Sequence, residues 1–187
     1  MNTSRAPARW SSATIALHWA SALIVLGLLA LGLAMVHATG DPARRYDLYQ
    51  LHKSLGFVAL ALLPARLIAR LARRAPPPPP MPAWQKRAGA TMHWALYLLT
   101  LVATLSGWLL ASATIIPIPT RFFNMFVVPN IVGSSAVMAA RMTCLHIGAT
   151  WLMLALVALH VAAALKHQFV DRDAVLQQIV PRWLAGR

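Results

Sequence analysis

Four long apolar stretches, separated by polar or proline-rich segments, dominate the hydropathy pattern of the chain. They run from about residue 13 to 36, 51 to 71, 91 to 113 and 142 to 165. At a helical rise of about 1.5 Å per residue, about 20 residues cross a hydrocarbon core of about 30 Å. The pattern therefore predicts an all-α integral membrane protein, built as an antiparallel four-helix bundle.

The connections between the predicted spans differ in kind. Residues 76–80 are five consecutive prolines, which cannot continue a helix and which predict an extended linker between the second and third spans. The loop 112–141 is long and apolar, but prolines interrupt it, so we expect it to cover one end of the bundle. Since the spans on either side of the linker look alike, we interpret residues 1–187 as one domain.

The overall composition supports a membrane protein and argues against a nucleic-acid partner. Hydrophobic residues make up 59% of the chain, charged residues only 11%, and the mean hydropathy is +0.61. A net charge of +13 would favour nucleic-acid binding in a soluble protein. At this hydropathy, we interpret the cations as anchors beside anionic lipid headgroups. The single cysteine, Cys144, excludes an intrachain disulfide and a CxxCH haem-attachment motif.

The distribution of lysine and arginine predicts the orientation of the bundle. Twelve of these cations flank the span ends that share a side with both termini, and five flank the opposite side. Cytoplasmic segments carry the excess of positive charge in membrane proteins. We therefore expect a four-pass protein with both termini in the cytoplasm.

Histidines recur at two depths within the predicted spans. His52 and His146 lie near the outer ends of their spans, and the inner ends carry His18, His93 and His160. The 14 residues between His146 and His160 correspond to about 21 Å along one helix face. An ionisable residue inside a span is a functional candidate, although any one of these histidines could simply bond a neighbouring helix. Together they offer an outer pair and an inner pair, in which either His18 or His93 partners His160.

Two imidazoles at one depth suit haem iron better than zinc. A zinc site usually takes four ligands from cysteine, histidine or carboxylate, but the spans contain no Asp or Glu and only one thiol. Haem needs one imidazole on each side of the ring and an apolar slot between helices. The spans therefore predict two bis-histidine haem sites and no side chain that makes or breaks covalent bonds.

Other residues at matching positions could complete such sites. Arg66, which follows His52 by 14 residues, and Arg70 could pair with the anionic haem propionates, or could snorkel to the headgroups. Gly56, one turn beyond His52, and Gly107 in the third span could let a macrocycle approach the backbone closely. Both glycines could equally serve helix packing alone.

The order of these motifs resembles the bacterial cytochrome b561 family. The matching features between Trp10 and Trp183 are LHW around His18, HKSLG from His52, Arg66, His93 with Gly107, and the H-x13-H pair His146 and His160. The resemblance implies two b-type haems. It implies that His18 and His160 bind the inner haem, that His52 and His146 bind the outer one, and that His93 lies beside them.

The resemblance also implies a function in the bacterial inner membrane. The best understood member of the family oxidises superoxide to O2 and reduces ubiquinone, which makes this chain a candidate oxidoreductase. His167 at the cytoplasmic interface could bond a quinone headgroup, or could be an ordinary surface histidine. The outer cations could steer an anionic substrate; they are Arg44, Arg45, Lys53, Arg121 and Arg141.

Two other functions stay open at this point. The chain could be a membrane-anchoring cytochrome b subunit that passes electrons for a partner dehydrogenase or hydrogenase. It could also be a transporter or proton channel that uses histidines as relays, although the absence of carboxylates from the spans disfavours this function.

Overall fold

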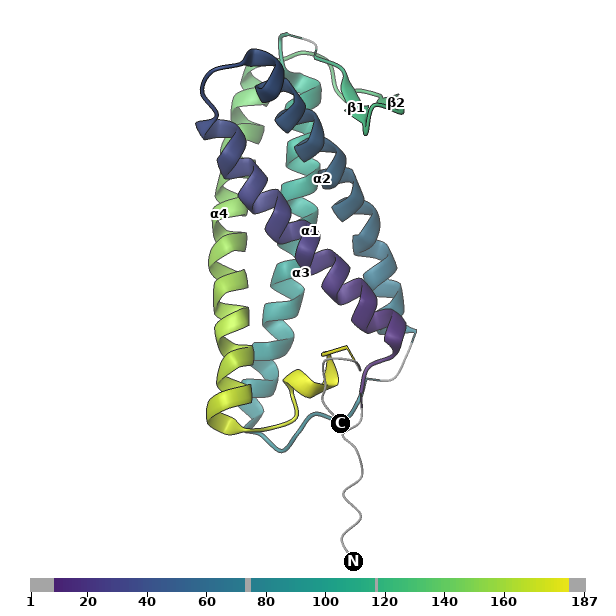
Figure 1. The fold of residues 1–187 in the computed structure, drawn as a ribbon, viewed down its shortest axis with the longest axis vertical. Helices are drawn as coiled ribbons and strands as arrows, with labels where there is room; N and C mark the ends of the chain where they lie inside the picture. The colour runs from purple at the N-terminus through teal and green to yellow at the C-terminus, as the bar shows by residue number, and fades with distance from the viewer. Residues whose placement is uncertain (1–8, 73–74, 117, 182–187) are drawn as a thin grey trace, which may run out of the picture.

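Four long helices run along the length of the molecule (Figure 1). The computed structural model describes residues 9–72, 75–116 and 118–181. The helices are α1 (Ser12–His37), α2 (Pro42–Leu71), α3 (Ala83–Ala113) and α4 (Ala136–Lys166). All four are long and apolar enough to cross a membrane. The predicted four-helix membrane bundle is therefore confirmed.

Three of the helices begin earlier than the apolar stretches that predicted them. α2 begins at Pro42 rather than near residue 51, α3 at Ala83 rather than near 91, and α4 at Ala136 rather than near 142. The starts are marked by local chemistry, such as the Ser135 side chain that accepts the backbone N–H of Met138 (3.3 Å). Hydropathy identifies only the apolar helical turns that face lipid, whereas a helix can start earlier, at the residue that caps it.

The helices pack mainly as two neighbouring pairs. α3 packs most extensively against α4 and α1 packs against α2, while contacts between α2 and α3 join the two pairs. Few side chains are fully buried among the described residues, and the apolar ones include Ala59, Tyr97, Ala149 and Met153. Most large apolar side chains point outward, as expected for a surface in contact with lipid.

The connection between α3 and α4 contains a short antiparallel hairpin. Strand β1 (Thr120–Phe122) pairs with β2 (Phe126–Val128), and Figure 1 shows both beside α2 at one end of the bundle. The turn places Phe123 at φ 45° and Asn124 at φ 60°, a conformation that residues other than glycine adopt rarely. We call this end of the molecule the hairpin end.

Two buried polar side chains of α2 fasten the hairpin to the bundle. The amide of Gln50 donates to the carbonyl of Pro119 (2.9 Å) and accepts from the backbone N–H of Arg121 (3.0 Å). The hydroxyl of Ser54 accepts from the backbone N–H of Phe123 (3.0 Å). Because Gln50 and Ser54 bracket residue 52 along α2, the hairpin is held at the depth of that histidine.

The first and last described segments meet at the opposite end, which we call the terminal end. α4 continues there into a π-helical turn, His167–Asp171. Beyond it, the carbonyl of Gln178 accepts the backbone N–H of Trp10 (3.2 Å), and that of Ile179 accepts the indole N–H of Trp19 (2.9 Å). The two segments therefore lie together at the lower end of the bundle as drawn in Figure 1.

Candidate functional site

The histidines of the four helices gather in two layers. In the upper layer, toward the hairpin end, the ring centres of His52 and His146 are 6.2 Å apart. In the lower layer, toward the terminal end, the ring of His160 lies 6.4 Å from that of His18 and 5.4 Å from that of His93. The structure thus brings together the predicted outer pair, and it brings both candidate partners of His160 within reach.

One spacing, repeated on all four helices, produces both layers. The pairs separated by 14 residues are His18 and Gly32, His52 and Arg66, His93 and Gly107, and His146 and His160. Fourteen residues complete nearly four helical turns, so both members of a pair point from the same helix face. Gly32 was not predicted as a site residue, although its spacing from His18 is the same signal that singled out Gly107.

Each upper imidazole rests against a glycine of a neighbouring helix. A Cβ atom added to Gly32 would lie 3.5 Å from Cε1 of His52, and one added to Gly107 would lie 3.1 Å from Cε1 of His146. A Cβ added to Gly56 would meet nothing within 4 Å. The close approach expected at Gly107 is therefore made by a histidine ring in this structure, and Gly56 is not in close contact with another helix.

The two upper imidazoles differ in their hydrogen bonds. Nδ1 of His146 lies 2.9 Å from the backbone carbonyl oxygen of Ala103. Because a carbonyl only accepts, Nδ1 carries the proton and Nε2 keeps a free lone pair. Nδ1 of His52 is buried and has no partner among the described residues. Buried polar atoms are nearly always paired, so this nitrogen marks a site that the surrounding protein groups do not complete.

Arg66 reaches from α2 into the lower layer. Its guanidinium donates to Nδ1 of His18 at 2.7 Å, and its Cζ atom lies 5.1 Å from the ring centre of Tyr97. Arg66 and Tyr97 also line a small cavity between the two layers. The guanidinium of Arg70 instead lies over the ring of Trp10, 5.8 Å from its centre. Of the two predicted arginines, Arg66 is therefore the one that is hydrogen-bonded to a layer histidine.

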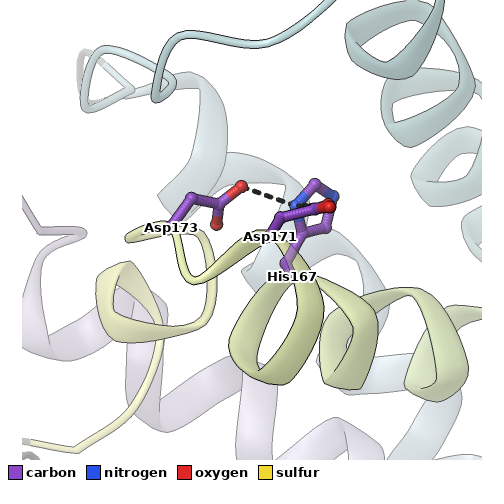
Figure 2. A group of neighbouring side chains, drawn as sticks. All are labelled: His167, Asp171 and Asp173. Atoms are coloured by element: carbon purple, nitrogen blue, oxygen red, sulfur yellow. Dashed lines mark hydrogen bonds and ion pairs between the residues drawn. The ribbon is translucent and has the colours of Figure 1, made fainter.

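His167 lies at the terminal end with two carboxylates (Figure 2). Its Nδ1 atom is 2.6 Å from Asp173 and 3.3 Å from Asp171, and the Lys166 ammonium pairs with Asp171 at 2.5 Å. The spacing of the three side chains could suit a cation, but Lys166 already supplies the positive charge. The bond to Asp173 places the ring proton on Nδ1, which leaves Nε2 of His167 available to another partner.

The cations predicted on the outer side lie around the hairpin end. They come from the first turns of α2, from the hairpin and from the start of α4, and all are exposed except the half-buried Lys53: Arg44, Arg45, Lys53, Arg121 and Arg141. Within the described part of the chain, the ion pairs all lie at the terminal end. The positive charge at the hairpin end is therefore not neutralised by these pairs.

Comparison with known proteins shows what this arrangement is similar to. The sequence model of prokaryotic cytochrome b561 matches residues 9–182. Cytochrome b561 homolog 2 of Escherichia coli K12 is 33% identical over 96% of this chain and 95% of its own length. Cytochrome b561 homolog 1 of the same organism is 30% identical over 93% of this chain and 98% of its own length. A probable superoxide oxidase, CybB of Yersinia pestis, is 24% identical over 93% of this chain and 97% of its own length.

Proposed function

Because the chain belongs to the prokaryotic cytochrome b561 family, we propose that its two histidine layers hold two b-type haems for electron transfer across the bacterial inner membrane. Transmembrane electron transfer and the binding of b-type haem follow from the family. The number of haems, the ligands and the electron partners are the proposal. The observation that carries it is that histidines pair at two depths. The ring centres are 6.2 Å apart in the upper pair and 6.4 Å apart between His18 and His160.

The spacing of the imidazoles suits axial ligation of iron. An imidazole nitrogen binds a transition metal at about 2.0–2.1 Å and lies about 1.15 Å from the centre of its ring, so two imidazoles that held one metal between them would have ring centres about 6.4 Å apart. The separations of His52 from His146 and of His18 from His160 agree with this value. The 5.4 Å between His93 and His160 is shorter. We therefore assign the first two pairs as ligands and His93 as their neighbour.

Ligation through His18 requires Arg66 to change its partner. An imidazole that binds iron through Nε2 carries its proton on Nδ1, where it can no longer accept a hydrogen bond. Arg66 must then turn from His18 to another acceptor, and a haem propionate is the kind of anion that a guanidinium binds well. When bound, haem supplies a one-electron Fe(III)/Fe(II) couple.

We propose that superoxide is the electron donor at the hairpin end. The excess of cations at the other end favours cytoplasmic termini and therefore an outward-facing hairpin end. Exposed Arg44, Arg45, Arg121 and Arg141 would attract an anion to this face. A relative named as a probable superoxide oxidase supports the same substrate. Each superoxide anion gives one electron and leaves as O2.

We propose ubiquinone as the electron acceptor at the terminal end. Reduction of one ubiquinone takes two electrons and two protons, and therefore consumes two superoxide anions. The free Nε2 atom of His167 can bond the quinone headgroup, because Asp173 holds the ring through Nδ1. His167 also follows His160 by two helical turns, which keeps the proposed acceptor close to the lower layer.

Haem content and single-histidine variants test the ligand assignment. The purified protein should contain two haems b per chain, with a split α band after reduction by dithionite. Replacing His52 or His146 by alanine should leave one haem. The matched control is His37→Ala, because His37 is exposed and bonds only the carbonyl of Leu33 in its own helix (2.8 Å). A helical protein without haem would reject the proposed function.

Stopped-flow mixing with superoxide tests the donor. We expect superoxide to reduce the protein, and we expect Arg44→Glu with Arg45→Glu to slow this reaction several-fold at low salt but little at high salt. A rate that depends on neither the charges nor the salt would reject the proposed steering. Stoichiometric co-purification of a soluble dehydrogenase or hydrogenase would instead favour an anchoring subunit.

A further inference from the structure

The imidazole of His146 lies in a notch on α3 that is formed by one helical turn. Its Nδ1 atom is 2.9 Å from the carbonyl oxygen of Ala103 and 3.4 Å from the hydroxyl of Ser106. The Ser106 hydroxyl also donates to the Ala103 carbonyl, at 3.1 Å. A Cβ atom on Gly107 would lie 3.1 Å from Cε1 and 3.3 Å from Nδ1 of His146. The missing side chain of Gly107 therefore provides the space that the ring occupies.

The position of this glycine determines which backbone group the ring can reach. In an α-helix, the carbonyl of one residue points toward the N–H of the residue four positions later. Gly107 is four positions after Ala103 in α3. A carbonyl has a second lone pair, but a side chain on the later residue would crowd a donor that approaches from the next helix. Glycine at position 107 leaves this approach open to His146.

We propose that Gly107 is a positioning residue for the upper haem, acting through His146. It admits the imidazole against the α3 backbone, so that Nδ1–H donates to Ala103 and Nε2 stays free to bind iron. This inference rests on the proposed function, because it takes His146 as an axial ligand. An imidazole that donates such a bond is a stronger electron donor, which favours Fe(III) and lowers the reduction potential.

The other half of the upper layer shows a looser version of the same contact. A Cβ atom on Gly32 would lie 3.5 Å from Cε1 of His52, which is ordinary van der Waals contact. Nδ1 of His52 has no acceptor among the described residues. An alanine at position 32 should therefore be accommodated, and the effect of an added methyl group should be concentrated at Gly107.

Gly107→Ala in the haem-loaded protein tests the proposal. We expect the midpoint potential of one haem to rise and its low-spin EPR signal to shift or be lost, while the other haem is unchanged. Gly148→Ala is the matched control, because Gly148 lies two residues from His146 and its added Cβ would meet nothing within 4 Å. This control should leave both haems as in the wild type, and Gly32→Ala should have a smaller effect than Gly107→Ala.

A Gly107→Ala protein with two haems and wild-type potentials and EPR signals would overturn the proposal. If that variant does not fold, pulsed ENDOR of the oxidised wild-type protein gives an independent answer. One upper axial imidazole should then show a hydrogen-bonded Nδ1 proton that exchanges slowly with D2O, and its absence would overturn the proposal. Failure of the proposed function would look different: the wild type would lack two haems, or His146→Ala would retain both.

Discussion

Among single residues, the lower layer offers more imidazoles than one iron can bind. His160 has His18 of α1 at 6.4 Å and His93 of α3, the helix that packs most extensively against α4, at 5.4 Å. The proposed choice between them depends on distance, because two imidazoles that held one metal between them would have ring centres about 6.4 Å apart. The proposed assignment therefore takes His18 as the ligand and His93 as a packing or hydrogen-bonding neighbour.

We expect His18→Ala to lose one of two haems and His93→Ala to keep both. The physical reason is that removal of His18 takes away the ring whose distance from His160 fits an iron between them. The pyridine haemochrome assay on purified protein measures the haem content per chain, and the α band identifies the haem that is lost. The opposite result would reverse the ligand assignment of the lower layer and leave the upper layer unaffected.

At the site, the sequence predicted the two histidine layers better than it predicted the groups that bond to the histidines. The 14-residue spacing identifies His146 with His160 and could also have identified Gly32, because it depends only on helix periodicity. The carbonyl of Ala103 could not be identified, since every residue has a carbonyl and only the packing of α4 on α3 selects this one. The contact of Arg66 with His18 likewise depends on how two helices meet.

Among the secondary-structure elements, the hairpin depends on α2 more than on its own strands. Each strand has three residues, and an isolated two-stranded hairpin is at best marginally stable in water. The turn also places Phe123 and Asn124 at positive φ without any glycine. The buried side chains of Gln50 and Ser54 compensate, because they accept hydrogen bonds from backbone N–H groups of the hairpin. The hairpin should therefore loosen when either side chain is removed.

Ser54→Ala should increase hydrogen exchange in the hairpin. The substitution leaves the partly buried N–H of Phe123 without its acceptor, at a cost of about 1 kcal/mol. If this cost lowers the free energy of local opening of the hairpin, hydrogen exchange in peptides from residues 118–131 should accelerate about five-fold or more. The control is Ser21→Ala, whose hydroxyl bonds only the Leu17 carbonyl in its own helix (2.7 Å). Equal exchange in the two variants would show that Ser54 does not hold the hairpin.

Hydropathy predicted the four helices but neither the starts of α2, α3 and α4 nor the hairpin, and the reasons are physical. The first turns of α2 carry Arg44 and Arg45, so they are helical without being apolar. Pro64 lies inside α2 without ending it, because a neighbouring helix and local adjustment can satisfy the freed carbonyl in a membrane. The hairpin is stabilised by Gln50 and Ser54, which lie about 70 residues earlier in the sequence.

Across the whole molecule, the two ends differ in charge and in construction. The terminal end gathers the first and last described segments, the proline-rich linker and the His167 cluster, whereas the hairpin end exposes cations over a short β-hairpin. The sequence pattern assigns twelve lysines and arginines to the side of the termini and five to the opposite side. In the proposed direction of electron flow, an outer anion gives electrons that pass to a quinone near the cytoplasm. This direction requires the hairpin end to face outward and the terminal end to face the cytoplasm.

Cysteine labelling tests that orientation. In a Cys144→Ala background, Asn124→Cys places a thiol on the hairpin and Ala75→Cys places one beside the proline linker, and both positions are exposed. A membrane-impermeant maleimide added to intact spheroplasts should label position 124 and spare position 75 until the membrane is permeabilised, because the more cationic end stays in the cytoplasm. The reverse pattern would put the hairpin end in the cytoplasm. Superoxide from the periplasm would then meet the terminal end instead of the hairpin-end cations on which the proposed steering depends, and that donor site would have to be abandoned.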